Sequence, residues 1–174
     1  MNKILLVGYM GSGKSTVGRV LAEKLNLPFF DLDVLIEQKE QKLVHEIFKT
    51  RGEIYFRKVE HQILNQFLQE NLNQEYVLSL GGGTPCYANN HEVLQYKDIF
   101  SIYLKTSIKQ LVDRLSASSN KRPLVTDKSN EELTEFVAKH LFDRSYFYHQ
   151  SKHTVTTDGK ITIEVVNEIL ALLT

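Results

Sequence analysis

Apolar residues in this chain form short continuous runs that alternate with longer segments of helical spacing. Residues 4–7 are the first such run, and after them Val17, Leu21 and Leu25 recur on one face of a helix. Short apolar runs are typical of strands buried on both faces of a parallel sheet, and one-faced spacing is typical of helices that cover such a sheet. The pattern therefore predicts a chain of alternating strands and helices.

The same alternation continues to the end of the chain. Strands are predicted over residues 3–8, 29–32, 76–80, 99–104 and 153–156. Helices are predicted over residues 14–25, 33–38, 44–71, 90–96, 108–115, 131–150 and 161–172, with a break at Arg51-Gly52 in the long third helix. This order predicts an α/β fold, a three-layer sandwich in which helices flank a central five-stranded parallel sheet.

Length and composition limit the possible protein classes. With no linker or repeat, residues 1–174 are expected to form one domain. The 21 basic and 21 acidic residues balance, and no segment is long and apolar enough to cross a membrane. A strand at the start of the chain predicts no leader peptide, and the single cysteine, Cys86, fits a reducing compartment as a small, partly buried residue. We expect a cytoplasmic monomer that binds neither nucleic acid nor membrane.

The first chemical motif lies between the first predicted strand and the first predicted helix. Gly8-Tyr9-Met10-Gly11-Ser12-Gly13-Lys14-Ser15 fits the phosphate-loop pattern G-x-x-x-x-G-K-[ST]. An ordinary Gly/Ser turn is the alternative, but this sequential context favours nucleotide binding, because the loop's N–H groups and the helix N-terminus attract phosphate. We expect Lys14 on the β and γ phosphates and Ser15 on Mg²⁺. The expected nucleotide-binding residues are Gly11, Ser12, Gly13, Lys14, Ser15 and Thr16 in this motif, and Arg122 further along the chain.

Other strings distinguish between the classes of phosphate-loop protein. A GTPase would carry Asn-Lys-x-Asp for guanine, and the nearest string, Asn120-Lys121-Arg122-Pro123, has proline where the carboxylate is needed. A motor or a large ATPase needs a much longer chain. A small-molecule or nucleotide kinase remains, and this chain has the size of one.

Asp31-Leu32-Asp33 follows at the end of the second predicted strand, where parallel sheets collect their ligands. Because side chains alternate along a strand, both aspartates are expected to point into one cleft. Asp33 is also placed to cap the helix that follows. Beside a phosphate loop a catalytic role is favoured, in which one carboxylate supports the water shell of Mg²⁺ and the other accepts the proton of an incoming hydroxyl.

Two further strings are candidates for substrate binding. Arg57 and Glu60 share a face of a predicted helix, either as a structural salt bridge or as an arginine fork that Glu60 orients toward a substrate carboxylate. Gly81-Gly82-Gly83 ends the third predicted strand, and three consecutive glycines favour close approach by a ligand over a plain turn.

Two strings in the last third of the chain carry the remaining candidates. The polar segment 116–130 contains Lys121-Arg122-Pro123-Leu124, which is either a solvated basic turn or part of a mobile lid that brings Arg122 onto the transferring phosphate. Arg144 and Tyr148 lie four apart on one face of a predicted helix.

Taken in this order, the strings resemble those of the shikimate kinases over nearly the whole chain. The phosphate loop followed by D-x-D is shared with other small kinases. E-I-F-x-x-x-G-E-x-x-F-R-x-x-E at residues 46–60, combined with G-G-G, R-P-L and R-x-x-x-Y, is much more specific. The resemblance implies ATP-dependent phosphorylation of the 3-hydroxyl of shikimate, in the pathway to chorismate and the aromatic amino acids. ATP and shikimate are thus the implied ligands, and Mg²⁺ is the implied cofactor.

The resemblance also implies which residues bind the substrate. Asp33 holds the substrate hydroxyls, and acts as a base or only orients them. Arg57 and Arg144 hold the carboxylate, and Gly82 contacts the ring. The implied substrate-binding region covers residues 33–61.

Further roles concern phosphoryl transfer. The implied catalytic residues are Lys14, Asp33 and Arg122, and Arg122 belongs to an implied lid over residues 116–130. Ser15 is the implied magnesium ligand, with Asp31 nearby through water.

The chain departs from the family's pattern in two places. Val44-His45 stands where Ser-Ile often precedes E-I-F, a change expected to be harmless at a helix start. After the last predicted strand, Thr157-Asp158-Gly159-Lys160 replaces a loop that commonly carries Arg or Pro against adenine, so no adenine contact is assigned there. Arg114 is either a stacking partner of the base or an exposed helical arginine.

Two other functions stay open at this point. One is another small-molecule kinase, of gluconate type, or a nucleoside monophosphate kinase, although Arg144 and the triple glycine argue against both. The other is a catalytically inactive phosphate-loop domain used for binding or signalling. The residues that argue against it are Lys14, Ser15, Asp33 and Arg122, all of which are intact.

Overall fold

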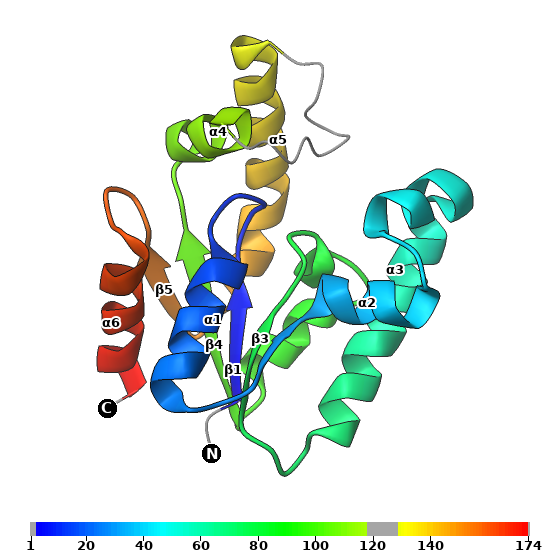
Figure 1. Cartoon of the computed structure of the whole chain (residues 1–174). Helices are drawn as coiled ribbons and strands as arrows, with labels where there is room; N and C mark the ends of the chain where they lie inside the picture. Colours follow the sequence, from blue (N-terminus) through cyan, green and yellow to red (C-terminus); the bar gives the residue numbers. More distant parts are fainter. Residues whose placement is uncertain (1–2, 118–128, 174) are drawn as a thin grey trace.

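Five parallel strands form one sheet in the computed structural model, which describes residues 3–117 and 129–173. The strands are β1 (Lys3–Val7), β2 (Phe29–Asp31), β3 (Tyr76–Ser79), β4 (Ile99–Lys105) and β5 (His153–Thr156). Their order across the sheet is β2-β3-β1-β4-β5. Because β1 lies between β3 and β4, the loop that follows it opens at the middle of the carboxyl edge of the sheet (Figure 1).

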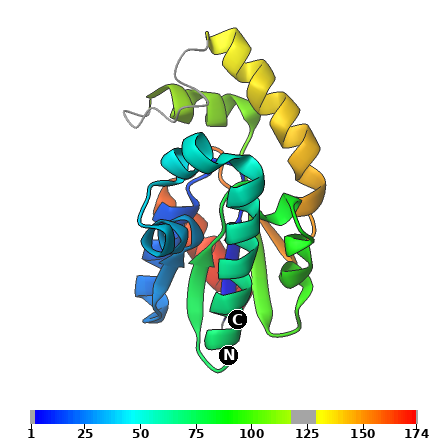
Figure 2. The same cartoon turned by 90° about the vertical axis from the view of Figure 1, so that its right-hand side faces the viewer.

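The described helices form layers on both sides of this sheet. They are α1 (Lys14–Leu25), α2 (Leu32–Glu40), α3 (Val44–Glu70), α4 (Ile108–Ala117), α5 (Asn130–Tyr148) and α6 (Thr162–Leu173), with the short 3₁₀ helices η1 (Thr84–Cys86) and η2 (Asn90–Gln95). Helices α1 and α6 pack together on one face, and α3 lies on the other (Figures 1 and 2). Helices α4 and α5 pack against each other and rise above the carboxyl ends of the strands.

Strand β1 shows why the chain needs apolar runs. Ile4 and Leu6 point into the core beneath α1 and α6, whereas Leu5 and Val7 point into the core on the opposite face. All four side chains are fully buried. A strand with helices on both faces has no solvated side, so alternation of apolar and polar residues is replaced by a continuous apolar run.

The predicted fold class is confirmed, and most element bounds agree to within two residues. Helix α1 has the predicted bounds, and Gly52, at φ 80° and ψ 172°, breaks the helical geometry inside α3 as expected. The segment at 90–96 is a 3₁₀ helix rather than an α-helix, and η1, directly after the triple glycine, was not predicted. No helix within the described residues is long and apolar enough to span a membrane.

At Gly18 helix α1 packs tightly against the sheet, and this glycine provides a test of the packing. A Cβ at this position would overlap the ring of Phe29 and lie 3.2 Å from Cδ1 of Leu6. Alanine normally stabilises a helix interior by about 1 kcal/mol relative to glycine. Here we expect Gly18→Ala to lower the free energy of unfolding by about 1 kcal/mol or more, because overpacking outweighs the helix propensity.

Urea denaturation of four proteins measures this effect: the parent, Gly18→Ala, Phe29→Ala and the double variant. If the Phe29 ring is the obstacle, Gly18→Ala is no longer destabilising in the Phe29→Ala background. A stabilising effect of Gly18→Ala in the parent would contradict the close packing of α1 on β2.

Candidate functional site

The loop between β1 and α1 forms a cradle of backbone amides. Gly11 and Gly13 have φ angles of 83° and 93°, in the left-handed region that favours glycine. Lys14, the first residue of α1, is buried, and its Nζ donates hydrogen bonds to the carbonyls of Gly8 at 2.8 Å and Tyr9 at 3.0 Å. The ammonium group is therefore held against the loop, beside the positive N-terminus of α1, which is the arrangement that attracts phosphate.

A groove of about 580 Å³ opens beside this loop. Its lining includes the six residues of the phosphate loop and helix start that the sequence assigns to nucleotide binding: Gly11, Ser12, Gly13, Lys14, Ser15 and Thr16. Arg114 forms part of the wall and donates a hydrogen bond to the Gly11 carbonyl at 3.1 Å, so it is not simply an exposed helical arginine. The groove is large enough for a nucleotide.

Another part of the lining comes from a loop to which the sequence assigned no contact. Thr157 and Lys160 line the groove together with the start of α6. Asp158 anchors this loop, because its carboxylate accepts hydrogen bonds from the backbone N–H and the hydroxyl of Ser107 at 3.1 and 2.6 Å. The only sequence signal for these residues was their position after the last strand, since their side chains do not match the family's pattern.

Asp31 and Asp33 occupy different structural positions. Ser15 Oγ donates a 2.6 Å hydrogen bond to Asp31 Oδ2, and Asp31 Oδ1 accepts the backbone N–H of Asp33 at 3.1 Å. Asp31 is thus the N-cap of α2, and the prediction that Asp33 caps this helix is wrong. Because β2 ends at Asp31, Asp33 lies in the first turn of α2, and the alternation of side chains along a strand does not determine its direction.

The Ser15–Asp31 pair has donor atoms that suit magnesium. A hydroxyl oxygen and a carboxylate oxygen are hard ligands, and Mg²⁺ usually takes only one or two of them from a protein, with phosphates and waters completing its shell. The described part of the chain contains no cluster of three or more His, Cys, Asp or Glu that could hold a metal ion.

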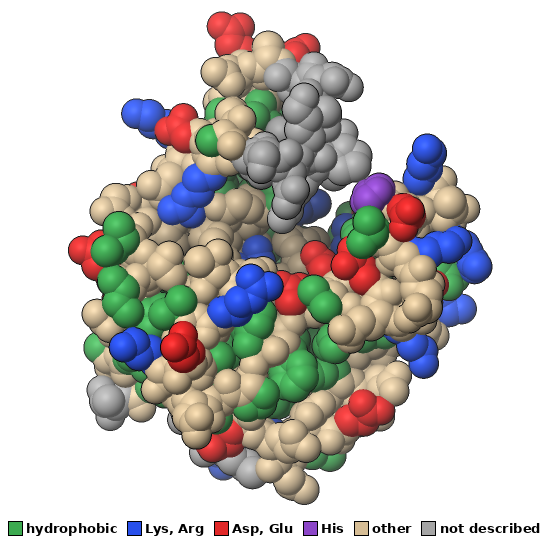
Figure 3. All heavy atoms as spheres, in the orientation of Figure 1, with side chains coloured by type: hydrophobic (Ala, Val, Ile, Leu, Met, Phe, Trp, Pro, Cys, Tyr) green, Lys and Arg blue, Asp and Glu red, His purple; other side chains and the backbone are tan. Residues whose placement is uncertain are grey.

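The triple glycine is the point at which the remaining candidates meet. A Cβ at Gly81 would lie 2.8 Å from Asp33 Oδ1, and one at Gly83 would lie 2.6 Å from Arg57 Nη2. At Gly82 it would lie 3.8 Å from Arg144 Nη1 and 3.3 Å from the backbone nitrogen of Met10, in the phosphate loop. Three side chains far apart in sequence therefore approach three consecutive glycines beside the nucleotide cradle. Figure 3 shows acidic and basic side chains gathered around a hollow on this side of the molecule.

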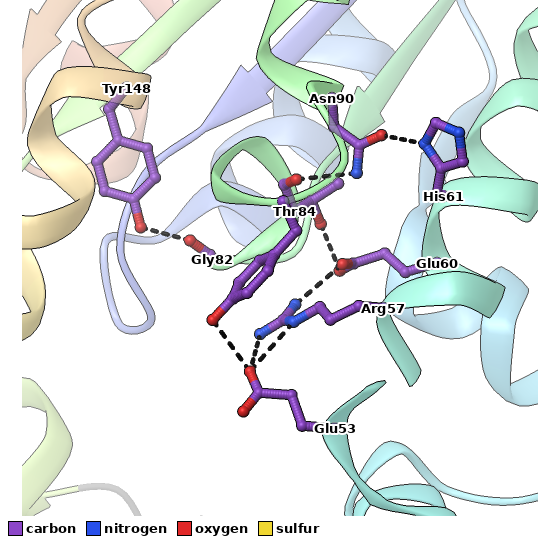
Figure 4. A network of polar contacts seen from close by, with 9 residues as sticks. Glu53, Arg57, Glu60, His61, Gly82, Thr84, Asn90 and Tyr148 are labelled. Atoms are coloured by element: carbon purple, nitrogen blue, oxygen red, sulfur yellow. Dashed lines mark hydrogen bonds and ion pairs between the residues drawn. The ribbon is translucent and has the colours of Figure 1, made fainter. Parts of the chain in front are cut away.

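Arg57 is oriented by a buried carboxylate. Its Nη1 donates to Glu60 Oε2 at 2.9 Å, and Glu60, only 1% exposed, accepts a second hydrogen bond from the Thr84 hydroxyl at 2.7 Å (Figure 4). Burial lowers the pKa of Arg57, but Glu60, Tyr87 and Glu53 together raise it by more, so the guanidinium stays charged. The salt bridge and the substrate fork considered from the sequence are compatible, because Glu60 contacts only one edge of the guanidinium.

The wall behind Arg57 continues into η2 through residues that carried no sequence signal. Asn90 Nδ2 donates to the Thr84 carbonyl at 3.0 Å, and Asn90 Oδ1 lies 2.7 Å from His61 Nδ1. On the open side, the ring centroid of Tyr87 lies 4.1 Å from the Arg57 guanidinium carbon. These contacts link α3 to the loop after β3.

Helix α5 reaches the middle glycine through Tyr148, which is fully buried. Its hydroxyl donates a hydrogen bond to the Gly82 carbonyl, and burial raises its pKa, so it remains a donor (Figure 4). Arg144, one turn earlier, lies 5.7 Å from the ring centroid of Tyr9. The predicted pairing of Arg144 and Tyr148 on one face is confirmed. Burial raises the pKa of the nearby Cys86 thiol to about 11, so it is protonated at neutral pH.

Arg122 and most of the expected lid cannot be placed relative to this site. Residues 118–128 lie outside the described residues, between α4, which ends at Ala117, and α5, which begins at Asn130.

Comparison with known proteins shows similarity to the shikimate kinases over nearly the full chain. The family model described as shikimate kinase matches residues 10–174. A shikimate kinase of Flavobacterium psychrophilum is 52% identical over 173 residues, which is 99% of each chain.

Solved structures agree with this similarity. The crystal structure of shikimate kinase from Bacteroides thetaiotaomicron has a TM-score of 0.90 and 34% identity, and the match covers 99% of this chain and 98% of that one. Shikimate kinase from Acinetobacter baumannii in complex with shikimate has a TM-score of 0.87 and 32% identity, with coverage of 99% and 93%.

The buried Glu60 carboxylate allows a test of the site's construction. Glu60→Ala would leave the Arg57 guanidinium and the Thr84 hydroxyl without their shared acceptor, and we expect the free energy of unfolding to fall by about 2–3 kcal/mol. Glu53→Ala, at the exposed side of the same arginine, should lower it by less than about 0.5 kcal/mol. Equilibrium denaturation in urea measures both values, and equal losses would show that Glu60 is no more important to the fold than Glu53.

Proposed function

This chain belongs to the shikimate kinase family, and from that membership we propose how its residues phosphorylate shikimate. The reaction is the ATP-dependent phosphorylation of the 3-hydroxyl of shikimate, which gives shikimate 3-phosphate and ADP. It is a step of chorismate and aromatic amino acid biosynthesis.

One observation carries the assignment of roles: a carboxylate and two guanidinium groups meet at Gly81-Gly82-Gly83 beside the phosphate loop. Shikimate is a compact ring with one carboxylate and several hydroxyls. A ring resting on the glycines would have Asp33 on the hydroxyl side and the two arginines on the carboxylate side. Planar arginine forks suit a carboxylate because they can make two parallel, charge-assisted hydrogen bonds.

The nucleotide is proposed to occupy the groove lined by Gly11–Thr16, Arg114 and the Thr157–Lys160 loop. Lys14 would bind the β and γ phosphates with the ammonium group that now bonds to two loop carbonyls. Ser15 would hold Mg²⁺ directly and Asp31 through water; the ion, when bound, neutralises charge on the β and γ phosphates. Arg122 is proposed as a further clamp on the transferring phosphate, a role supported by its place in R-P-L alone.

Asp33 is proposed to accept or orient the proton of the attacking hydroxyl. Its Oδ1 lies beside Gly81 at the edge of the cleft, and Asp31 takes over the capping of α2. Asp33 is therefore not the cap of α2, and its position beside Gly81 supports the proposed contact with the substrate hydroxyl. In a loose transition state little base strength is needed, so orientation is the larger part of its contribution.

The organisation proposed for the whole chain is correspondingly simple. Residues 1–174 act as one kinase domain, with residues 33–61 forming the substrate-binding region and 116–130 a lid. The position of α2 and the first half of α3 beside the triple glycine supports the first of these regions. The balanced charge supports the absence of nucleic-acid and membrane partners, and a cytoplasmic monomer is proposed with it.

A coupled assay of ADP release, with and without shikimate, tests the proposed function. ADP release that depends on shikimate supports it, and Lys14→Met is the control, because loss of this clamp should raise the barrier by about 3 kcal/mol or more. Gluconate and nucleoside monophosphates complete the panel. Phosphorylation of gluconate or of a nucleoside monophosphate in place of shikimate would contradict the substrate assignment.

Replacement of Asp33 separates catalysis from nucleotide binding. We expect Asp33→Asn to lower kcat by at least about tenfold while the Kd for ATP changes little, because the variant keeps the size of the side chain but not its charge. Steady-state kinetics and nucleotide titration measure the two effects. Unchanged kcat and KM would show that Asp33 has no part in the reaction.

Replacement of either arginine tests the carboxylate site. Arg57→Lys and Arg144→Lys should each raise the KM for shikimate about ten- to a hundredfold, because lysine keeps the charge but cannot reproduce the planar fork. The KM for ATP should stay near that of the parent. If both variants bind shikimate normally in a direct titration, these arginines have only structural roles.

A further inference from the structure

Arg57 has one edge on the open side of its contact network, and Glu53 occupies it. The Nη1 atom donates to Glu60, and both terminal nitrogens lie against Gly83, where a Cβ would be 2.6 and 2.8 Å away. The remaining edge, formed by Nε and Nη2, points to a single oxygen, Oε1 of Glu53, at 3.3 and 3.4 Å. Any other carboxylate that binds this edge must therefore take the place of Glu53.

The Glu53 contact is weak in comparison with the Glu60 contact on the same guanidinium. Its two distances lie beyond the usual range for charge-assisted bonds, and both N–H groups share one oxygen, so the parallel two-bond geometry is not formed. The Glu53 side chain is 53% exposed, whereas that of Glu60 is 1% exposed. An exposed ion pair of this kind contributes little free energy, and its carboxylate can turn into solvent without disturbing the core.

Tyr87 contacts both Arg57 and Glu53. Its hydroxyl donates a 3.0 Å hydrogen bond to the same Glu53 oxygen, and its ring lies over the Arg57 guanidinium at 4.1 Å. Figure 4 shows Glu53 on the open side of Arg57, opposite Glu60 and Thr84. The ring can keep the guanidinium in position while the acceptor at its edge changes.

We propose that Glu53 is an intramolecular competitor of the substrate carboxylate: it occupies the open-side edge of Arg57 in the empty site and is displaced when shikimate binds. This inference rests on the proposed function, in which Arg57 binds that carboxylate. Glu53 is then a specificity-determining residue. A ligand carboxylate can offer one oxygen to each of the two Arg57 N–H groups that now share Oε1 of Glu53. A ligand without a carboxylate leaves Arg57 paired with Glu53.

The alternative is that Glu53 orients Arg57 for the substrate, as Glu60 does. The two roles predict opposite changes in the affinity for shikimate when Glu53 is replaced. Removal of a competitor strengthens shikimate binding, because the free energy of breaking the internal pair no longer opposes it. Removal of an orienting group weakens binding, because the guanidinium loses a contact that holds it in place.

Isothermal titration of the full chain with shikimate decides between them. We expect Glu53→Gln to lower the Kd for shikimate about two- to fivefold, since the displaced pair is exposed and worth little. The primary amide of shikimate, which has no charged carboxylate, should bind the parent and Glu53→Gln equally. The matched control is Asp143→Asn, which removes one negative charge from an exposed position next to Arg144; it should change the Kd for shikimate by less than Glu53→Gln does.

The contrary outcomes are distinct from one another. A parent chain that binds shikimate, combined with an equal or higher Kd for Glu53→Gln, overturns the competitor role and leaves the proposed function standing. An equal decrease of the Kd for shikimate in Asp143→Asn also overturns the competitor role. The effect would then come from the loss of any negative charge near the site and not from the Glu53–Arg57 pair. A parent chain that does not bind shikimate at all overturns the proposed function, and the inference with it.

Discussion

The site depends on the absence of side chains at Gly81 and Gly83. A Cβ at either position would lie within 3 Å of a functional atom, Oδ1 of Asp33 in the first case and the terminal nitrogens of Arg57 in the second. Real Cβ contacts are longer than this, so any other residue would push the carboxylate or the guanidinium out of the cleft. The bare backbone after β3 thus sets the spacing between the Asp33 carboxylate and the Arg57 guanidinium, the two groups proposed to bind the hydroxyl and the carboxylate of the substrate.

The backbone can hold this position because polar contacts support it on two sides. Tyr148 donates to the Gly82 carbonyl from α5, and Glu60 joins Arg57 to Thr84 from α3. A buried carboxylate would be costly if it were alone, but Glu60 has an ionic partner and a hydroxyl donor, which together offset its desolvation. The same residues therefore fix the geometry of the site and stabilise the junction between helices and sheet.

Local sequence patterns were sufficient for the fold and for naming most of the residues that the structure brings together at the candidate site. The strand bounds, the phosphate loop and the break at Gly52 depend on neighbours within a few residues, and all were predicted. The capping residue of α2 was not predicted correctly, because Asp31 and Asp33 are equally good caps in sequence. Only the position at which β2 ends decides between them. The loop at Thr157 and Lys160 was missed for a related reason, since its role comes from its place beside the groove rather than from its side chains.

The Glu53–Tyr87 contact shows the limit of sequence reasoning most clearly. The two residues are 34 positions apart, and nothing in the string around Tyr87 indicates that it lies over an arginine of α3. The string G-E-x-x-F-R contains both Glu53 and Arg57, yet an i,i+4 pair on a helix reads as ordinary surface stabilisation. Only the geometry reveals that one guanidinium has a buried, well-formed partner on one edge and an exposed, poorly formed partner on the other. That difference separates the part of the site that must stay fixed from the part that can exchange with a ligand.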